Sequence, residues 1–168
     1  MKAASFSSGW ASSKPPLLRF LDECHAKFSS DDDGSVANYI PELSKAVPAH
    51  FGIGLATLDG HVYEVGDSQV PFTIQSVSKP FVFALALHTL GASRVESAIG
   101  VEPSGDPFNS IRLNAANHPF NPMVNAGAIA CSGLNHRIAG AGAFALIQEE
   151  LWRFAGRPLA LDSPVYES

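Results

Sequence analysis

The sequence predicts an α+β fold, in which an antiparallel β-hairpin is combined with several helices. The hairpin is indicated by Asp59-Gly60, a favoured two-residue turn, between the apolar stretches 51–58 and 61–66. The helices are indicated by apolar residues at helical spacing, or by an apolar run bounded by helix start and stop residues. They are predicted at 16–28, 76–90 and 142–156.

The composition is typical of a globular protein with a buried core. Hydrophobic residues make up 46% of the 168 residues and charged residues only 16%. The net charge of -5, with no basic cluster, argues against nucleic acid or an anionic membrane as a partner. Cys24 and Cys131 lie far apart without a CxxC motif, so we expect two free thiols.

The first part of the chain does not resemble a secretory signal. Residues 1–16 are rich in Ser, Ala and Pro and predict a loose tail without the apolar core of a secretory signal. No apolar run reaches the ~20 residues of a membrane helix. The aspartates of 29–35 lack the ligand spacing of calcium loops, so we interpret that stretch as a linker. We therefore expect a cytoplasmic protein without a membrane partner.

The stretch "FTIQSVSKPF" places a serine and a lysine three residues apart, Ser76 and Lys79. Pro80 is tolerated only in a first helical turn, so the helix begins near 76–79 and Gly91 ends it. Residues three apart on a helix share a face, which brings the amine within reach of the hydroxyl. The neighbouring Ser78 points elsewhere and is interpreted as a capping or packing residue.

Two interpretations of Ser76 and Lys79 follow from the residues alone. A helix N-terminus and burial both disfavour a cation, so Lys79 would become a neutral amine that takes a proton from Ser76. Backbone N–H groups at the helix start would then stabilise the developing negative charge, as in S-x-x-K acyl-serine enzymes. The alternative is a serine N-cap with a lysine extending from the first turn into water. Spacing alone leaves both open.

Four blocks in order along the chain resemble one family. They are "GSVANYIPEL", "FTIQSVSKPF", "VEPSGDPFNS" and "HPFNPMVNAGAIA". Together they are similar to the serine-dependent glutaminases, over about residue 34 to the C-terminus. The last two blocks fall largely in 92–127, a Gly-, Pro- and Asn-rich stretch that we predict to be irregular and functional. The resemblance implies a serine β-lactamase-like fold, an antiparallel sheet with helices beside a helical subdomain.

The resemblance also assigns roles to five residues. It implies that Ser76 is the nucleophile and Lys79 its base, and that Gln75 lies beside the bound substrate. Asn125 matches an asparagine that binds the amino-acid end of glutamine, and Tyr39 matches a tyrosine that closes over the pocket and assists proton transfer. From the residues alone, Asn125 could instead be a turn residue and Tyr39 a core aromatic.

The activity implied is hydrolysis of L-glutamine to L-glutamate and ammonia through an acyl-serine intermediate, without a metal or organic cofactor. Family members commonly form homo-oligomers, dimers or tetramers. One alternative is another S-x-x-K enzyme of the β-lactamase or cell-wall peptidase type. A second is a non-catalytic fragment that pairs with full-length subunits.

The chain departs from the family pattern at its C-terminus. It ends at Ser168, before the family positions of a substrate-binding glutamate, a later asparagine, two tyrosines and a Lys-Ser-Gly strand. We therefore expect residues 1–33 to be a tail, helix and acidic linker, and 34–168 the N-terminal part of a catalytic domain. A chain without the later positions is expected to be weakly stable and nearly inactive alone.

Overall fold

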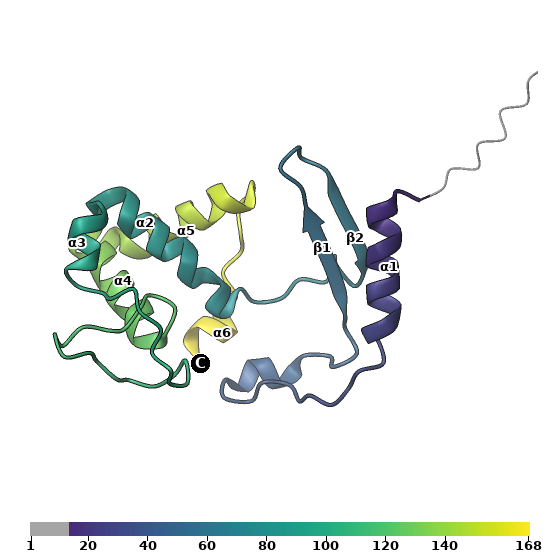
Figure 1. The fold of residues 1–168 in the computed structure, drawn as a ribbon, viewed down its shortest axis with the longest axis horizontal. Helices are drawn as coiled ribbons and strands as arrows, with labels where there is room; N and C mark the ends of the chain where they lie inside the picture. Colours follow the sequence, from purple (N-terminus) through teal and green to yellow (C-terminus); the bar gives the residue numbers. More distant parts are fainter. Residues whose placement is uncertain (1–13) are drawn as a thin grey trace, which may run out of the picture. The chain divides into compact units, whose positions relative to one another are not determined.

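The computed structural model describes residues 14–168, which fall into two compact units (Figure 1). Unit 1 comprises the described residues up to Phe72 together with Asp162–Ser168, and unit 2 comprises Thr73–Leu161. Most of the predicted N-terminal tail lies outside the described residues. Within the described part of the chain, every helix is too short or too polar to cross a membrane.

Unit 1 contains the predicted helix and hairpin. Helix α1 (Pro16–Phe28) packs against strands β1 (Gly52–Ala56) and β2 (Val62–Gly66), which pair antiparallel. Side chains alternate along both strands, as a half-buried hairpin requires. Leu21 of α1 and Val65 of β2 are buried in this small core. The predictions of this helix and of the hairpin are confirmed.

The hairpin turn has the predicted Asp-Gly chemistry. Gly60 has φ 88°, a left-handed conformation that a residue with Cβ adopts only at a cost. The Thr57 amide donates to the His61 carbonyl at 2.9 Å and closes the turn. The Thr57 hydroxyl donates to the Asp59 carboxylate, and this bond, with a smaller contribution from His61, holds the pKa of Asp59 below its ordinary value.

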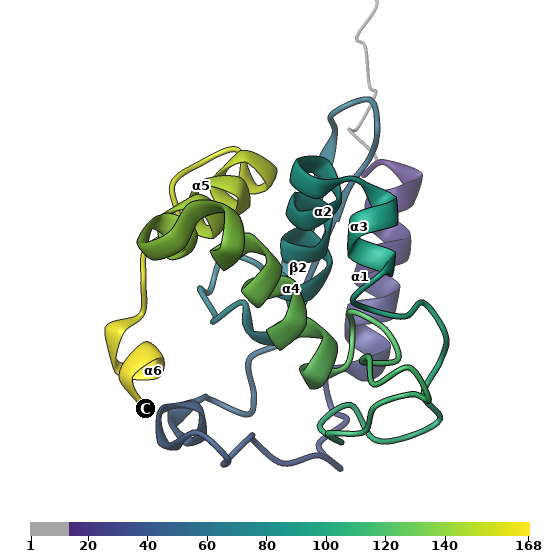
Figure 2. The same ribbon diagram turned by 90° about the vertical axis from the view of Figure 1, so that its left-hand side faces the viewer.

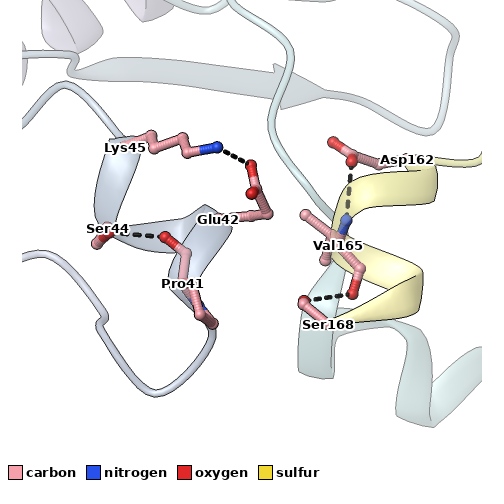
Figure 3. Close-up of polar contacts among 7 residues, drawn as sticks. All are labelled: Pro41, Glu42, Ser44, Lys45, Asp162, Val165 and Ser168. Carbon is pink, nitrogen blue, oxygen red and sulfur yellow. Dashed lines mark hydrogen bonds and ion pairs between the residues drawn. The ribbon is translucent and has the colours of Figure 1, made fainter.

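Two short elements of unit 1 were not predicted from the sequence. They are the 3₁₀ helix η1 (Pro41–Lys45) and helix α6 (Ser163–Glu167), which contact each other. Figure 3 shows that each is stabilised by local polar contacts, an ion pair from Lys45 to Glu42 in η1 and the Asp162 carboxylate, which accepts a backbone N–H in the first turn of α6. Elements of five residues carry too little periodicity to be recognised in a sequence.

Unit 2 is built around helix α2 (Lys79–Leu90), which follows a 3₁₀ turn, η2 (Gln75–Ser78). Helices α3 (Ala92–Glu96), α4 (Asn125–Ala139) and α5 (Ala143–Ala155) all contact α2 (Figure 2). A helix that is apolar on nearly all sides is stable only when other elements cover it. The predicted central position of this helix within its unit is therefore confirmed.

The core of unit 2 lies where α2, α3 and α4 meet. Its buried residues are Val82, Ala86, Val95, Ile99, Cys131 and Leu134. Burial raises the pKa of the Cys131 thiol to about 11. Cys131 and the half-buried Cys24 are both free, as the sequence predicted.

The helix bounds confirm two predictions and correct a third. Gly91, at φ 78°, ends α2, and Gly156, at φ 67°, ends α5. The prediction that 92–127 is irregular throughout is wrong at both ends, because α3 and the start of α4 lie within it. Helix α4 escaped recognition since its glycines and small residues obscure the apolar spacing that reveals an amphipathic helix.

Candidate active site

Ser76 lies in the short 3₁₀ turn that leads into α2. Gln75, directly before it, has φ 43°, a left-handed conformation that is rare for a residue with a side chain and costs roughly 1–3 kcal/mol. The turn is closed by the Lys79 amide, which donates to the Ser76 carbonyl. As a result, the Ser76 side chain is exposed just before a helix whose buried residues, Val82, Leu85 and Ala86, lie in its middle turns.

Lys79 is held by two oxygen acceptors, one in the loop before α4 and one on the first residue of α4. Its Nζ donates to Asn125 Oδ1 at 2.7 Å and to the Met123 carbonyl at 3.0 Å. The same Nζ lies 5.6 Å from the centre of the Phe108 ring, within cation–π range. The Lys79 side chain therefore turns inward and is only partly accessible, which excludes the alternative of a lysine extended freely into water.

Asn125 is the first residue of α4, so it is not the isolated turn residue considered as an alternative. Its amide donates to the Phe108 carbonyl at 2.8 Å, and its side-chain oxygen accepts from Lys79. The structure thus brings together two of the predicted site residues that are 46 positions apart in the chain.

Ser76 and Lys79 lie one helical turn apart, and the turn, not a direct hydrogen bond, sets their relative positions. In a 3₁₀ turn, side chains three residues apart eclipse, which places both on one face. No hydrogen bond joins the Ser76 hydroxyl to Lys79 within residues 14–168, and catalytic hydrogen bonds are often long in a free enzyme. The Val77 amide donates to the Ile74 carbonyl at 3.0 Å, whereas the Ser76 amide has no acceptor in the described residues.

Gln75 and Ser78, on either side of Ser76 in the same turn, make local contacts. The Ser78 hydroxyl donates to the Gln75 carbonyl at 2.7 Å, which fits the capping or packing role expected of Ser78. The Gln75 side chain donates to the Thr73 hydroxyl at 3.2 Å. These contacts stabilise the strained backbone before Ser76.

Tyr39 belongs to unit 1 and directly precedes Ile40, the N-cap of η1. Its side chain is 70% exposed, so the alternative of a core aromatic is not supported. Its proposed part in the site stays a prediction. Among residues 14–168, no three His, Cys, Asp or Glu side chains are close enough together to hold a metal ion.

Two residues around Lys79 were not identified from the sequence as site residues. Met123 contributes a backbone carbonyl, which no side-chain pattern can reveal. Phe108 contributes its ring and its carbonyl, and its only signal was its place in the block "VEPSGDPFNS".

The fold is shared with proteins of known structure. The protein Mglu, solved in a form with tris and glutamate, superposes with a TM-score of 0.82 at 36% identity, covering 92% of this chain and 35% of the Mglu chain. The predicted α+β fold is thereby confirmed.

Sequence comparison gives the family. The glutaminase family profile matches residues 34–168. Glutaminase 1 of Bradyrhizobium diazoefficiens is 73% identical over 162 residues, which are 96% of this chain and 26% of that protein. The glutaminase of Microcystis aeruginosa is 47% identical over 157 residues, 91% of this chain and 46% of that protein. The chain belongs to the glutaminase family, and it spans about a quarter to a half of the length of these relatives.

Proposed function

We propose that the protein hydrolyses L-glutamine to L-glutamate and ammonia, with Ser76 as nucleophile and Lys79 as its base. The observation that carries the proposal is the pair of hydrogen bonds from Lys79 Nζ to Met123 and Asn125, beside an exposed serine on a strained turn. Family membership supports glutamine as the substrate.

The two acceptors suit a lysine that acts as a base. An uncharged amine carries two N–H donors and one lone pair, whereas the ammonium carries three donors and no lone pair. The Met123 carbonyl and Asn125 Oδ1 can accept both donors of the uncharged amine. Its lone pair is then directed away from these oxygens and is available for the Ser76 proton.

The reaction proceeds as an acyl transfer in two halves. The Ser76 oxygen attacks the side-chain amide carbon of glutamine while its proton passes to Lys79. The C–N bond then breaks, the nitrogen takes that proton, and ammonia leaves a glutamyl ester on Ser76. Water attacks the ester, one of its protons passes through Lys79 to the serine oxygen, and glutamate is released.

The Ser76 amide is the oxyanion donor in this proposal. It has no acceptor among the described residues and lies beside the attacking oxygen, whereas the neighbouring Val77 amide is already bonded to Ile74. Loss of one such donor commonly costs ~3 kcal/mol of transition-state stabilisation. Asn125 Oδ1 faces Lys79, which leaves its side-chain NH₂ group for the substrate.

The test is ammonia release from glutamine by the purified protein. Ser76→Ala removes the nucleophile, and Lys79→Met removes the amine but keeps a side chain of similar length. Each is expected to lower kcat at least roughly a thousandfold, as for other nucleophile and base deletions.

Ser78→Ala is the matched control, because the Ser78 hydroxyl donates to the Gln75 carbonyl of its own turn. Loss of one such bond is expected to change kcat less than about tenfold. Unchanged release in Ser76→Ala would contradict the proposal, and loss in Ser78→Ala alone would make Ser78 the nucleophile. Cytoplasmic location, homo-oligomerisation and the role of Tyr39 stay predictions from the resemblance.

A further inference from the structure

The loop before α4 is organised by one side chain, Asn121. Its Oδ1 accepts the backbone amides of Met123 at 3.0 Å and Val124 at 3.2 Å, an Asx-type turn. Its Nδ2 donates to the Glu102 carbonyl at 2.9 Å, which connects the loop to a segment 19 residues earlier in the chain. The three hydrogen-bond partners of the Asn121 side chain are therefore all backbone groups.

The loop is also pressed against the first turns of α4. A Cβ on Gly127 would lie 1.9 Å from the Asn121 carbonyl oxygen, so only glycine permits this approach. Pro122 and Val124 are both buried beside it. The backbone from Asn121 to Asn125 is thus fixed from two sides, by the Asn121 side chain and by the start of α4.

We propose that Asn121 is a positioning residue for Lys79. By accepting the Met123 and Val124 amides, it turns the Met123 carbonyl toward Lys79 Nζ and sets Asn125 at the start of α4. The inference about catalysis rests on the proposed role of Lys79 as base, whereas the inference about geometry does not. Within residues 14–168 no hydrogen bond joins Asn121 to Lys79, so in this proposal Asn121 acts through the loop.

The chain contains a close structural match that serves as a control. Asn114 Oδ1 also accepts two backbone amides of its own loop, those of Ala116 at 2.9 Å and His118 at 3.0 Å. Among residues 14–168, no residue hydrogen-bonded to Asn114 is also hydrogen-bonded to Lys79. Substitution of either asparagine by leucine removes the two hydrogen bonds that stabilise its own turn. Only Asn121→Leu is expected to disturb Lys79.

The first readout is the side-chain ¹H–¹⁵N spectrum of the lysines in the purified protein. Lys79 is one of five lysines in the sequence printed above, and its signal is assigned by its loss in Lys79→Met. We expect protection of the Lys79 amine protons from solvent exchange to fall by roughly tenfold or more in Asn121→Leu, since one of two acceptors is misplaced. In Asn114→Leu the signal is expected to be unchanged.

The second readout is kcat for glutamine. Asn121→Leu is expected to lower kcat roughly 10- to 100-fold, because small displacements of a base are costly, and Asn114→Leu less than about threefold. Asn121→Asp keeps an oxygen for the two amides but loses the Nδ2 donor to the Glu102 carbonyl, so its Lys79 signal and kcat are expected to lie between those of Asn121→Leu and wild type. Melting curves by circular dichroism show whether each variant is folded, and Asn121→Asp supplies the test if Asn121→Leu does not fold.

The outcomes separate this inference from the proposed function. If the Lys79 signal of folded Asn121→Leu matches wild type, or if Asn114→Leu perturbs it equally, the positioning role is wrong. The role is equally wrong if Asn121→Asp folds stably and restores neither readout. If the signal responds as expected but wild type releases no ammonia from glutamine, the proposed function fails and the structural role of Asn121 stands.

Discussion

Unit 1 and unit 2 differ in how their helices are stabilised. In unit 1, α1 covers a two-stranded hairpin, and Leu21 and Val65 are its buried apolar residues. In unit 2, α2 is packed by α3, α4 and α5 around a continuous core. A two-stranded hairpin is marginal without further packing, and a helix owes most of its stability to the packing of its apolar face. Lys79 and Asn125 thus begin two helices of the better-packed unit, as precise positioning requires.

The largest expected difference between the units is in thiol reactivity. At pH 8, a pKa of about 11 leaves roughly one Cys131 thiol in a thousand ionised, and burial restricts access further. Cys24, half-buried on α1 in unit 1, lacks this protection. We expect iodoacetamide to modify Cys24 at least about a hundredfold faster than Cys131, as measured by peptide mass spectrometry.

Urea provides the control for that measurement, because unfolding exposes both thiols and should make their rates similar. Equal rates in the native protein would mean that the core of unit 2 opens as readily as unit 1, and the comparison between the units would be wrong.

The next largest effect is expected from truncation of buried aliphatic side chains. Ile99 in unit 2 is 1% exposed and Val65 in unit 1 is 8% exposed. Ile99→Ala should cost about 3–4 kcal/mol and Val65→Ala about 2 kcal/mol, following the number of buried carbons removed. Amide hydrogen exchange should show lost protection in α2 for the first and in the hairpin for the second. Loss throughout the chain from either variant would instead indicate one cooperative body.

The smallest expected effects come from two glycines of α4, which differ in sign. Gly127→Ala must displace the Asn121 carbonyl and should destabilise the protein by about 1–3 kcal/mol. Gly133→Ala has no atom within 4 Å of the new Cβ and should stabilise the helix by up to ~1 kcal/mol. Thermal melting followed by circular dichroism measures both. Destabilisation by Gly133→Ala would contradict the open space that the structure shows around Gly133.

Much of the fold could be predicted because the signals were local. Pro80 and Gly91 limit α2, Gly156 ends α5, and Asp59-Gly60 sets the hairpin turn. Each acts through backbone conformation, which depends on the residue itself. Helix α4 lacked such a signal, because its small residues suit close packing and weaken the apolar periodicity.

The site was predictable only in part, because only some of its residues carry a local signal in the sequence. Ser76 and Lys79 were found by their spacing, and Asn125 by resemblance to a family. The connection of Lys79 to Asn125 depends on how α2 packs against α4, which spacing does not encode. Met123 contributes its backbone carbonyl, and the Asn121 side chain accepts a backbone amide of another residue. Both contacts involve backbone groups, which a sequence pattern does not reveal.

The most direct test of the central claim is to trap the acyl-enzyme. The purified protein is mixed with glutamine, quenched in acid within milliseconds, digested and analysed by mass spectrometry. A glutamyl ester on Ser76, present in wild type and absent from Ser76→Ala, is the predicted result. Ammonia release without an adduct on Ser76, or with an adduct on Ser78 instead, would contradict Ser76 as the nucleophile.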